Sequence, residues 1–302
     1  MKIVRPISIL DANLISSSVA ENDYAAWSSG TTYGLGDRAI YVVANTHWII
    51  ESLQAGNIGH TPTGTDADLW WLTVGYTNRW KMFDGAIQSQ TSAADSIVVT
   101  LESATERLDS VALFNVDCAT ARVKVTDATD GIVYDETVSM VSPSGITDWY
   151  AYFFEPITRI TDYVFTELPP YLSADVEVTL ANAGNTVLCG ACVLGLSREI
   201  GGTQYGAQTG IQDYSIKQKD AFGNYSILER AYNKRASFQI MVANSMIDEL
   251  QTILAGFRAT PVVYVGTDLY ASTMVYGFYK DFSVVISYPT VSILSIELEG
   301  LT

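Results

Sequence analysis

Ala236-Ser237-Phe238-Gln239-Ile240-Met241-Val242, followed by the run from 244 to 257, is the stretch that decides the fold. Its first part alternates apolar and polar side chains, so that Phe238, Ile240 and Val242 share one face. Strict alternation is the pattern of a half-buried β-strand. The sequence therefore predicts a strand at 236–242.

The second part of this stretch has the pattern of a helix. Its apolar side chains recur at helical spacing, at Ile247, Leu250, Leu254 and Phe257. Asn244 or Ser245 can cap the start, Asp248 and Glu249 suit the first turn, and Pro261 ends the helix. We therefore expect one amphipathic helix packed on an antiparallel sheet, which is an α+β unit.

Further strands on both sides complete an α+β domain over residues 196–302. They are expected at Ile211–Gln218, Tyr225–Arg230, Val262–Val265, Met274–Tyr279, Phe282–Ser287 and Val291–Glu299. In the last strand, apolar side chains such as Leu294 would face the core, while Glu297 and Glu299 face outward. Because acidic side chains guard a free edge against wrong pairing, this strand is either a sheet edge or an ordinary half-buried strand inside the sheet.

Residues 77–195 consist of short alternating runs separated by turn residues. Eight runs are expected to be strands: Ser96–Leu101, Ser110–Val116, Ala121–Val125, Gly131–Val138, Trp149–Phe154, Tyr163–Leu168, Val176–Leu180 and Val187–Leu194. Strands at this spacing predict an antiparallel, jelly-roll-like β-sandwich. The chain as a whole is expected to be mostly β.

Residues 1–20 have the pattern of an extended arm. Ile3, Val4, Ile7 and Leu10 are followed by the polar run Ser16-Ser17-Ser18. Such an arm lies on another domain or on a neighbouring subunit, or it is a frayed terminus. The sequence leaves both alternatives open.

Residues 21–76 form a compact aromatic module. Its large aromatics are Trp27, Tyr33, Tyr41, Trp48, Trp70, Trp71 and Tyr76. The turn Tyr33-Gly34-Leu35-Gly36-Asp37 precedes an expected strand at Arg38–Val43, and Pro62 marks a later loop. This spacing resembles the small chitin- and cellulose-binding modules of bacterial chitinases. The resemblance implies a carbohydrate-binding-like module.

Sugar binding in that family uses exposed rings that stack on the pyranose faces, one of them between the second strand and the proline. The corresponding interval here, residues 51–60, contains no Trp or Tyr. Trp27, Tyr33 and Trp70 are expected to fill the core, because so small a domain needs large aromatics to make one. The remaining candidates for glycan binding are Trp48, Trp71 and His60. We therefore expect weak or absent glycan binding.

The net charge argues against several partners. The chain of 302 residues has a formal charge of −16, whereas a protein that binds nucleic acid needs a basic surface to neutralise phosphates. Residues 1–195 carry 9 Lys and Arg against 23 Asp and Glu, and residues 196–302 carry 8 against 10. The nearly neutral C-terminal part can therefore pack against copies of itself with little repulsion. No apolar run suits a signal peptide or a membrane span, so we expect synthesis in a cytoplasm and no membrane insertion.

Three cysteines, an odd number, argue against a disulfide framework. The spacing of Cys189 and Cys192 imitates a redox or zinc motif, but no second cysteine pair or nearby histidine completes a zinc site. The two side chains are expected on opposite faces of a strand, as buried free thiols. We expect no metal and no cofactor.

The segments Gly201-Gly202-Thr203-Gln204-Tyr205-Gly206 and Val275-Tyr276-Gly277-Phe278-Tyr279-Lys280-Asp281-Phe282 resemble those of tailed-bacteriophage tail and baseplate proteins. The resemblance implies a structural role in the virion. It also implies a subunit, made in the host cytoplasm, that assembles with copies of itself and with other tail proteins.

Catalytic residues are not evident in the sequence. Both histidines, His47 and His60, lie in the aromatic module, and no phosphate loop or dinucleotide fingerprint is present. We therefore predict that the chain is not an enzyme. Two other functions stay open: a receptor-binding or adhesion protein that holds host glycan, and an enzyme that degrades surface polysaccharide.

Overall fold

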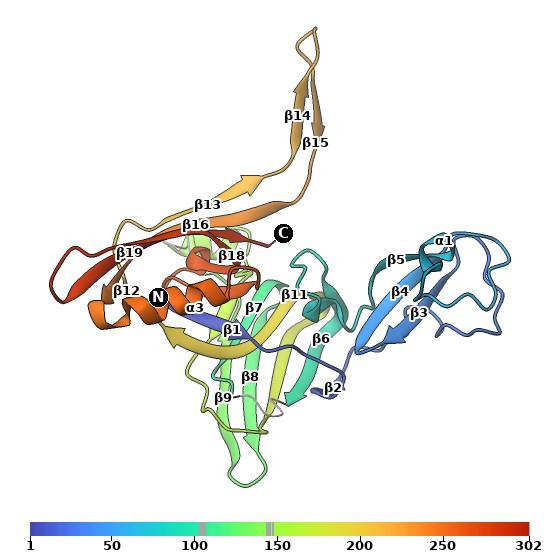
Figure 1. The fold of residues 1–302 in the computed structure, drawn as a ribbon, viewed down its shortest axis with the longest axis horizontal. Coiled ribbons are helices and arrows are strands. Elements are labelled where there is room, and N and C mark those ends of the chain that lie inside the picture. The colour runs from blue at the N-terminus through green and yellow to red at the C-terminus, as the bar shows by residue number, and fades with distance from the viewer. Residues whose placement is uncertain (103–106, 143–145, 147, 302) are drawn as a thin grey trace.

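The computed structural model describes residues 1–102, 107–142, 146 and 148–301. It confirms a mostly β protein whose paired strands are antiparallel (Figure 1). The helical elements are short: α1 (Ala67–Trp70), α2 (Trp149–Phe154), α3 (Ile247–Gly256) and the 3₁₀ turns η1 (Lys81–Phe83), η2 (Asn244–Met246) and η3 (Ala271–Thr273). No helix in the described ranges is long and apolar enough to cross a membrane.

The sandwich-like part of the molecule is organised around β11 (Asp175–Glu199). Its neighbours are β2 (Leu14–Ser17), β6 (Thr91–Glu102), β7 (Ser110–Asp117), β8 (Thr120–Asp127), β9 (Gly131–Ser139) and β10 (Tyr163–Phe165). The first half of β11 lies between β6 and β8, and its second half pairs with β7. Buried side chains of all these neighbours except β2 and β9 share one core with β11. Two expected strands, 176–180 and 187–194, are therefore parts of one strand.

The first strand joins this core to the rest of the sheet. β1 (Lys2–Pro6) pairs with β11 on one side and with β17 (Val262–Val265) on the other. Gly195 permits this approach, because a Cβ there would lie 2.1 Å from the carbonyl oxygen of Arg5. The boundary expected between residues 195 and 196 thus falls inside β11, and the sheet runs across it without a break.

The C-terminal part confirms the expected helix on an antiparallel sheet. From β17 the sheet continues through β18 (Met274–Val285), β19 (Val291–Gly300), β16 (Tyr232–Ala243) and the short β12 (Gly202–Thr203). Leu250 and Leu254 of α3 are buried against Phe238 and Ile240 of β16 in one cluster. The predicted amphipathic stripe therefore faces the sheet.

Two details of this part correct the sequence analysis. Strand β19 lies between β18 and β16, so it is the half-buried interior strand and not an edge. The side chain of Asn244 does not cap the helix. Its amide donates to the carbonyl of Tyr288 at 2.8 Å, and its oxygen accepts from Ser292 at 2.6 Å. The start of α3 is instead formed by the turn η2.

One expected strand is a helix. Residues 149–154 form α2, in which Trp149, Tyr150, Tyr152, Phe153 and Phe154 are all exposed. Consecutive aromatics favour strands by propensity, but no neighbouring strand pairs with this segment in the described part of the chain. The strand prediction was wrong here, because propensity alone does not supply a pairing partner.

The aromatic module is a separate three-stranded sheet made of β3 (Arg38–Val43), β4 (Thr46–Ser52) and β5 (Trp71–Tyr76), with α1 directly before β5. Figure 1 shows the module at one side of the molecule, away from α3. Its small core consists of Tyr33, Ala39, Ile50 and Trp71. The turn at Gly34–Asp37 leads into β3 as expected.

A long hairpin projects from the sheet that contains β13 (Gln208–Asp213) and β16 (Figure 1). β13 pairs with β16 at the sheet, and the chain then leaves the body as β14 (Ile216–Lys219) and β15 (Tyr225–Leu228). These two strands form a sheet of their own and extend away from all other elements (Figure 1). We refer to residues 216–228 as the projecting hairpin.

Candidate functional site

Half-buried rings form a row on one face of the aromatic module. Trp48 on β4 lies directly opposite Tyr41 on β3 and Tyr76 on β5. Trp27 meets Tyr41 edge-on, with ring centroids 5.5 Å apart. The Tyr41 hydroxyl lies 3.1 Å from that of Thr63. The β3–β4 register therefore places Trp48 beside a second ring, Tyr41, that the sequence analysis did not select, and both rings pack against the core of the module with part of their surface exposed.

Trp71, the second candidate, belongs to the core. It is 4 % exposed, its Nε1 donates to the carbonyl of His60 at 2.8 Å, and Tyr33 packs edge-on against it at 5.0 Å. A ring enclosed in this way presents no free face to a sugar. The structure therefore corrects the assignment of Trp71 as an exposed ring.

His60, the third candidate, packs against Trp70 and not beside Trp48. Its ring stacks on Trp70 at a centroid distance of 3.6 Å and an interplanar angle of 10°. One face of the imidazole is thus already covered by Trp70, which is itself half-buried. The three candidates do not form one flat platform, and Trp48 with Tyr41 is the pair that keeps partly exposed rings side by side.

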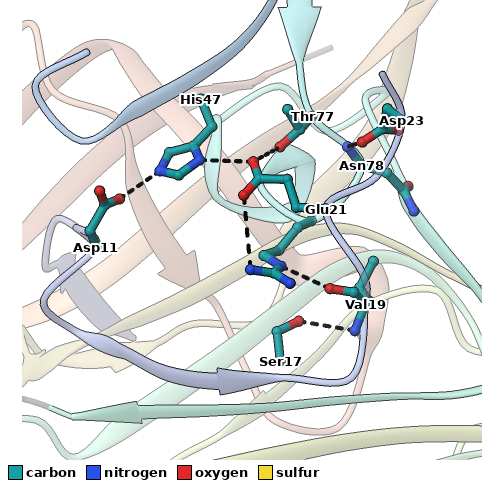
Figure 2. A network of polar contacts seen from close by, with 9 residues as sticks. Asp11, Ser17, Val19, Glu21, Asp23, His47, Thr77 and Asn78 are labelled. Atoms are coloured by element: carbon teal, nitrogen blue, oxygen red, sulfur yellow. Dashed lines mark hydrogen bonds and ion pairs between the residues drawn. The ribbon is translucent and has the colours of Figure 1, made fainter. Parts of the chain in front are cut away.

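A polar network lies between the module and the sandwich (Figure 2). His47 on β4 is held between two carboxylates: Nδ1 is 2.8 Å from Glu21 and Nε2 is 2.8 Å from Asp11. Its ring also stacks on Trp80 at 4.7 Å. Because both ring nitrogens face carboxylates, neither can take a proton from a nucleophile, so the cluster lacks the geometry of a catalytic triad.

Glu21 extends this network to the beginning of the sandwich. Its carboxylate accepts from the Thr77 hydroxyl at 2.7 Å and lies 3.9 Å from the guanidinium of Arg79, which donates to the carbonyl of Val19 at 2.8 Å (Figure 2). Asn78 adds a backbone contact to Asp23 at 3.2 Å. The network connects the segments before and after β2, strand β4 and the chain after β5, so it fixes the module on the body.

The cysteines are free and buried, but their arrangement differs from expectation. Cys189 and Cys192 face the same core, together with Cys118, whereas Ala191 faces another cluster. The alternation is interrupted opposite Gly190, where Asn115 of β7 has a left-handed φ of 50°. A Cβ at Gly190 would lie 2.2 Å from the carbonyl oxygen of Ile87, so the site requires glycine.

The environment of these thiols keeps them protonated. Burial raises the pKa of Cys118 to about 11 and that of Cys192 to about 12, and it raises the pKa of Cys189 as well. A protonated thiol is a poor nucleophile and a poor metal ligand. In the part of the chain that the structure describes, no group of three or more His, Cys, Asp or Glu side chains is arranged to hold a metal ion.

The projecting hairpin exposes apolar side chains on both faces. Phe222 at its tip is 91 % exposed, and Tyr225, Ile227 and Leu228 are also exposed. Exposed apolar groups that gather on one element mark interaction surfaces in soluble proteins. Sequence analysis predicted one strand over 211–218, which the structure divides between β13 and β14, and a second strand where β15 lies. It did not predict the projection, because an isolated hairpin and a sheet strand have the same local pattern.

Comparison of the chain with protein-family models, with curated proteins and with solved structures found no match.

Proposed function

We propose that this chain is a structural subunit of a bacteriophage tail tip or baseplate, made in the host cytoplasm and assembling with copies of itself and with other tail proteins. The observation that carries the proposal is the projecting hairpin, whose apolar side chains have no partner on the body of the described chain. The hairpin belongs to residues 196–302, whose net charge is only −2. Near-neutral charge lowers the repulsion between copies.

The experiment is assembly of the full chain. We expect analytical ultracentrifugation to detect oligomers, alone or with tail proteins of the same virion, and electron microscopy to show rings. A chain that stays monomeric at high concentration and binds none of these proteins would contradict the proposal.

A second candidate function is glycan binding by a receptor-binding or adhesion protein. The observation in its favour is the pair Trp48 and Tyr41, which lie side by side and partly exposed. With Trp71 buried and His60 stacked on Trp70, the platform is small, and weak retention on chitin, cellulose or host polysaccharide is expected. Strong retention that Trp48→Ala abolishes, with Leu53→Ala as an exposed control, would favour this candidate over the assembly role.

A further inference from the structure

The aromatic module and the sandwich have separate apolar cores. In the part of the chain that the structure describes, the core around Tyr33 and Trp71 shares no residue with the core around β11. Asn78, which follows β5, holds the end of the module on β6. Its amide donates to the carbonyl of Ser92 at 2.8 Å, and its oxygen accepts from the Ser92 N–H at 2.9 Å. The orientation of the module about this point therefore depends on further polar contacts, among them those of His47.

The His47 ring contacts one carboxylate on each side (Figure 2). Nδ1 lies 2.8 Å from Oε1 of Glu21, and Nε2 lies 2.8 Å from Oδ1 of Asp11. An ionised carboxylate only accepts hydrogen bonds, and a neutral imidazole has one N–H donor, whereas the imidazolium has two. Both contacts are therefore satisfied together only when the ring carries two protons and a positive charge.

The other groups around this imidazole agree with a charged ring. Its plane stacks on Trp80 of the chain after β5, with ring centroids 4.7 Å apart, and an indole face attracts a cation. Of the remaining charged groups in the network, Arg79 lies 3.9 Å from Glu21, and Asp23 accepts from a backbone N–H. The contacts of the ring with two carboxylates and an indole face all stabilise the imidazolium.

The two carboxylates differ in what holds them. The Glu21 side chain is 16 % exposed and keeps its contacts with Thr77 and Arg79 whatever the charge of the ring. The Asp11 side chain is 43 % exposed, and within the described ranges its carboxylate contacts His47 alone. A ring that loses one proton keeps the Nδ1–H that donates to Glu21, and its Nε2 lone pair then faces the Asp11 carboxylate. That contact becomes repulsive, so the Asp11 side is the one that opens.

We propose that His47 is a pH-sensitive latch between the aromatic module and the body. The doubly protonated ring connects β4 of the module to Asp11, which lies between β1 and β2 of the body. When the ring loses a proton as the pH rises, this connection is lost and the module turns more freely about Asn78. Histidine is the side chain whose charge ordinarily changes between about pH 5 and 8, so the attachment is tighter at the acidic end of this range and looser at the alkaline end. The latch acts within one chain and does not depend on the proposed assembly function.

The protonation state of the latch is tested by NMR of the full chain with ¹⁵N-labelled histidine. The sequence contains two histidines, so the His47 signals are those that disappear in the His47→Gln variant. At about pH 6 both ring nitrogens of His47 are expected to carry a proton, and at about pH 8.5 only Nδ1. A ring with a single proton at about pH 6, or one whose protonation stays the same over this range, would overturn the proposal.

The attachment is tested by limited proteolysis between the module and the sandwich, with Asp11→Asn digested beside the wild type at each pH. The Asn amide accepts from a protonated Nε2 through its oxygen and donates to an unprotonated Nε2 through its nitrogen, so this variant keeps the contact in both states of the ring. From about pH 6 to about pH 8.5, the ratio of the wild-type rate to the Asp11→Asn rate is expected to rise about fivefold, the effect of losing one hydrogen bond to a charged group.

Taking this ratio at each pH removes the pH dependence of the protease itself. Asp281→Asn, the same exchange at an exposed position on β18, is the matched control and is expected to be digested at the wild-type rate throughout. A wild type and an Asp11→Asn variant with the same pH dependence would overturn the proposal.

Discussion

Ile3→Ala is expected to destabilise the sandwich core and the helix-bearing sheet together. Ile3 is 2 % exposed and packs in the core under α3, while its strand pairs with both β11 and β17. Truncation removes three carbons, a transfer loss of about 2.4 kcal/mol. The cavity that remains raises the cost toward about 4 kcal/mol.

Urea unfolding followed by circular dichroism measures the loss in the free energy of unfolding that Ile3→Ala causes. A loss between about 2.4 and about 4 kcal/mol lowers the urea midpoint by about 0.8 to 1.3 M if the m-value is about 3 kcal/mol/M. Hydrogen exchange with mass spectrometry then compares residues 91–199 with residues 232–300. Ile15→Ala, from the same arm but 51 % exposed, is the matched control and should stay within about 0.5 kcal/mol. A midpoint shift as small as the control's, or separate unfolding of the two regions, would refute the reasoning that β1 joins them.

Three further predictions concern buried groups. Leu254→Asp is expected to unfold the helix-bearing sheet, because a buried unpaired carboxylate costs several kcal/mol; an unchanged melting curve would contradict this. Burial raises the pKa of Cys118 to about 11 and of Cys192 to about 12 from an ordinary 9.0. The contribution of the protonated thiols to the free energy of unfolding is therefore complete below pH 9 and is lost as the pH rises through these values. Neither thiol should react with iodoacetamide in the native protein at pH 8, and rapid native labelling would disprove that. His47→Phe keeps a ring against Trp80 but loses both carboxylate contacts, so we expect a loss of about 1–3 kcal/mol and faster proteolysis between the module and the sandwich; equal digestion rates would show that the network does not fix the module.

The sequence predicted those features that depend on local patterns. The apolar stripe with Leu254 and the alternation at Phe238 and Ile240 require only neighbouring residues, and the structure confirms both. The pairing of β1 between β11 and β17 could not be predicted, because it joins segments far apart in the chain. Helix α2 shows that a local pattern can also predict the wrong element, because its aromatic side chains favour a strand but, in the described part of the chain, no neighbouring strand pairs with them.

The candidate site also has features that depend on local sequence patterns and features that depend on contacts between distant segments. The sequence analysis selected Trp48 but not Tyr41, because their pairing depends on the register of β3 and β4 and not on alternation alone. The burial of Trp71 depends on the loop that brings the His60 carbonyl to its indole nitrogen, and no local pattern encodes that contact. The contacts of His47 with Asp11 and Glu21 join three separate segments. An interruption such as the left-handed Asn115 also reverses the faces of a strand without a clear signal in the sequence.

The central position of β1 has a consequence for the order in which the protein forms. Lys2 pairs with Glu199 and with Val265, so during synthesis β1 has no partner until residues far later in the chain have been made. Contacts of such high sequence separation make folding slow, and the unpaired edges of β11 and β17 stay open to other chains until β1 arrives. Insertion of this strand is therefore a late step that completes the sheet.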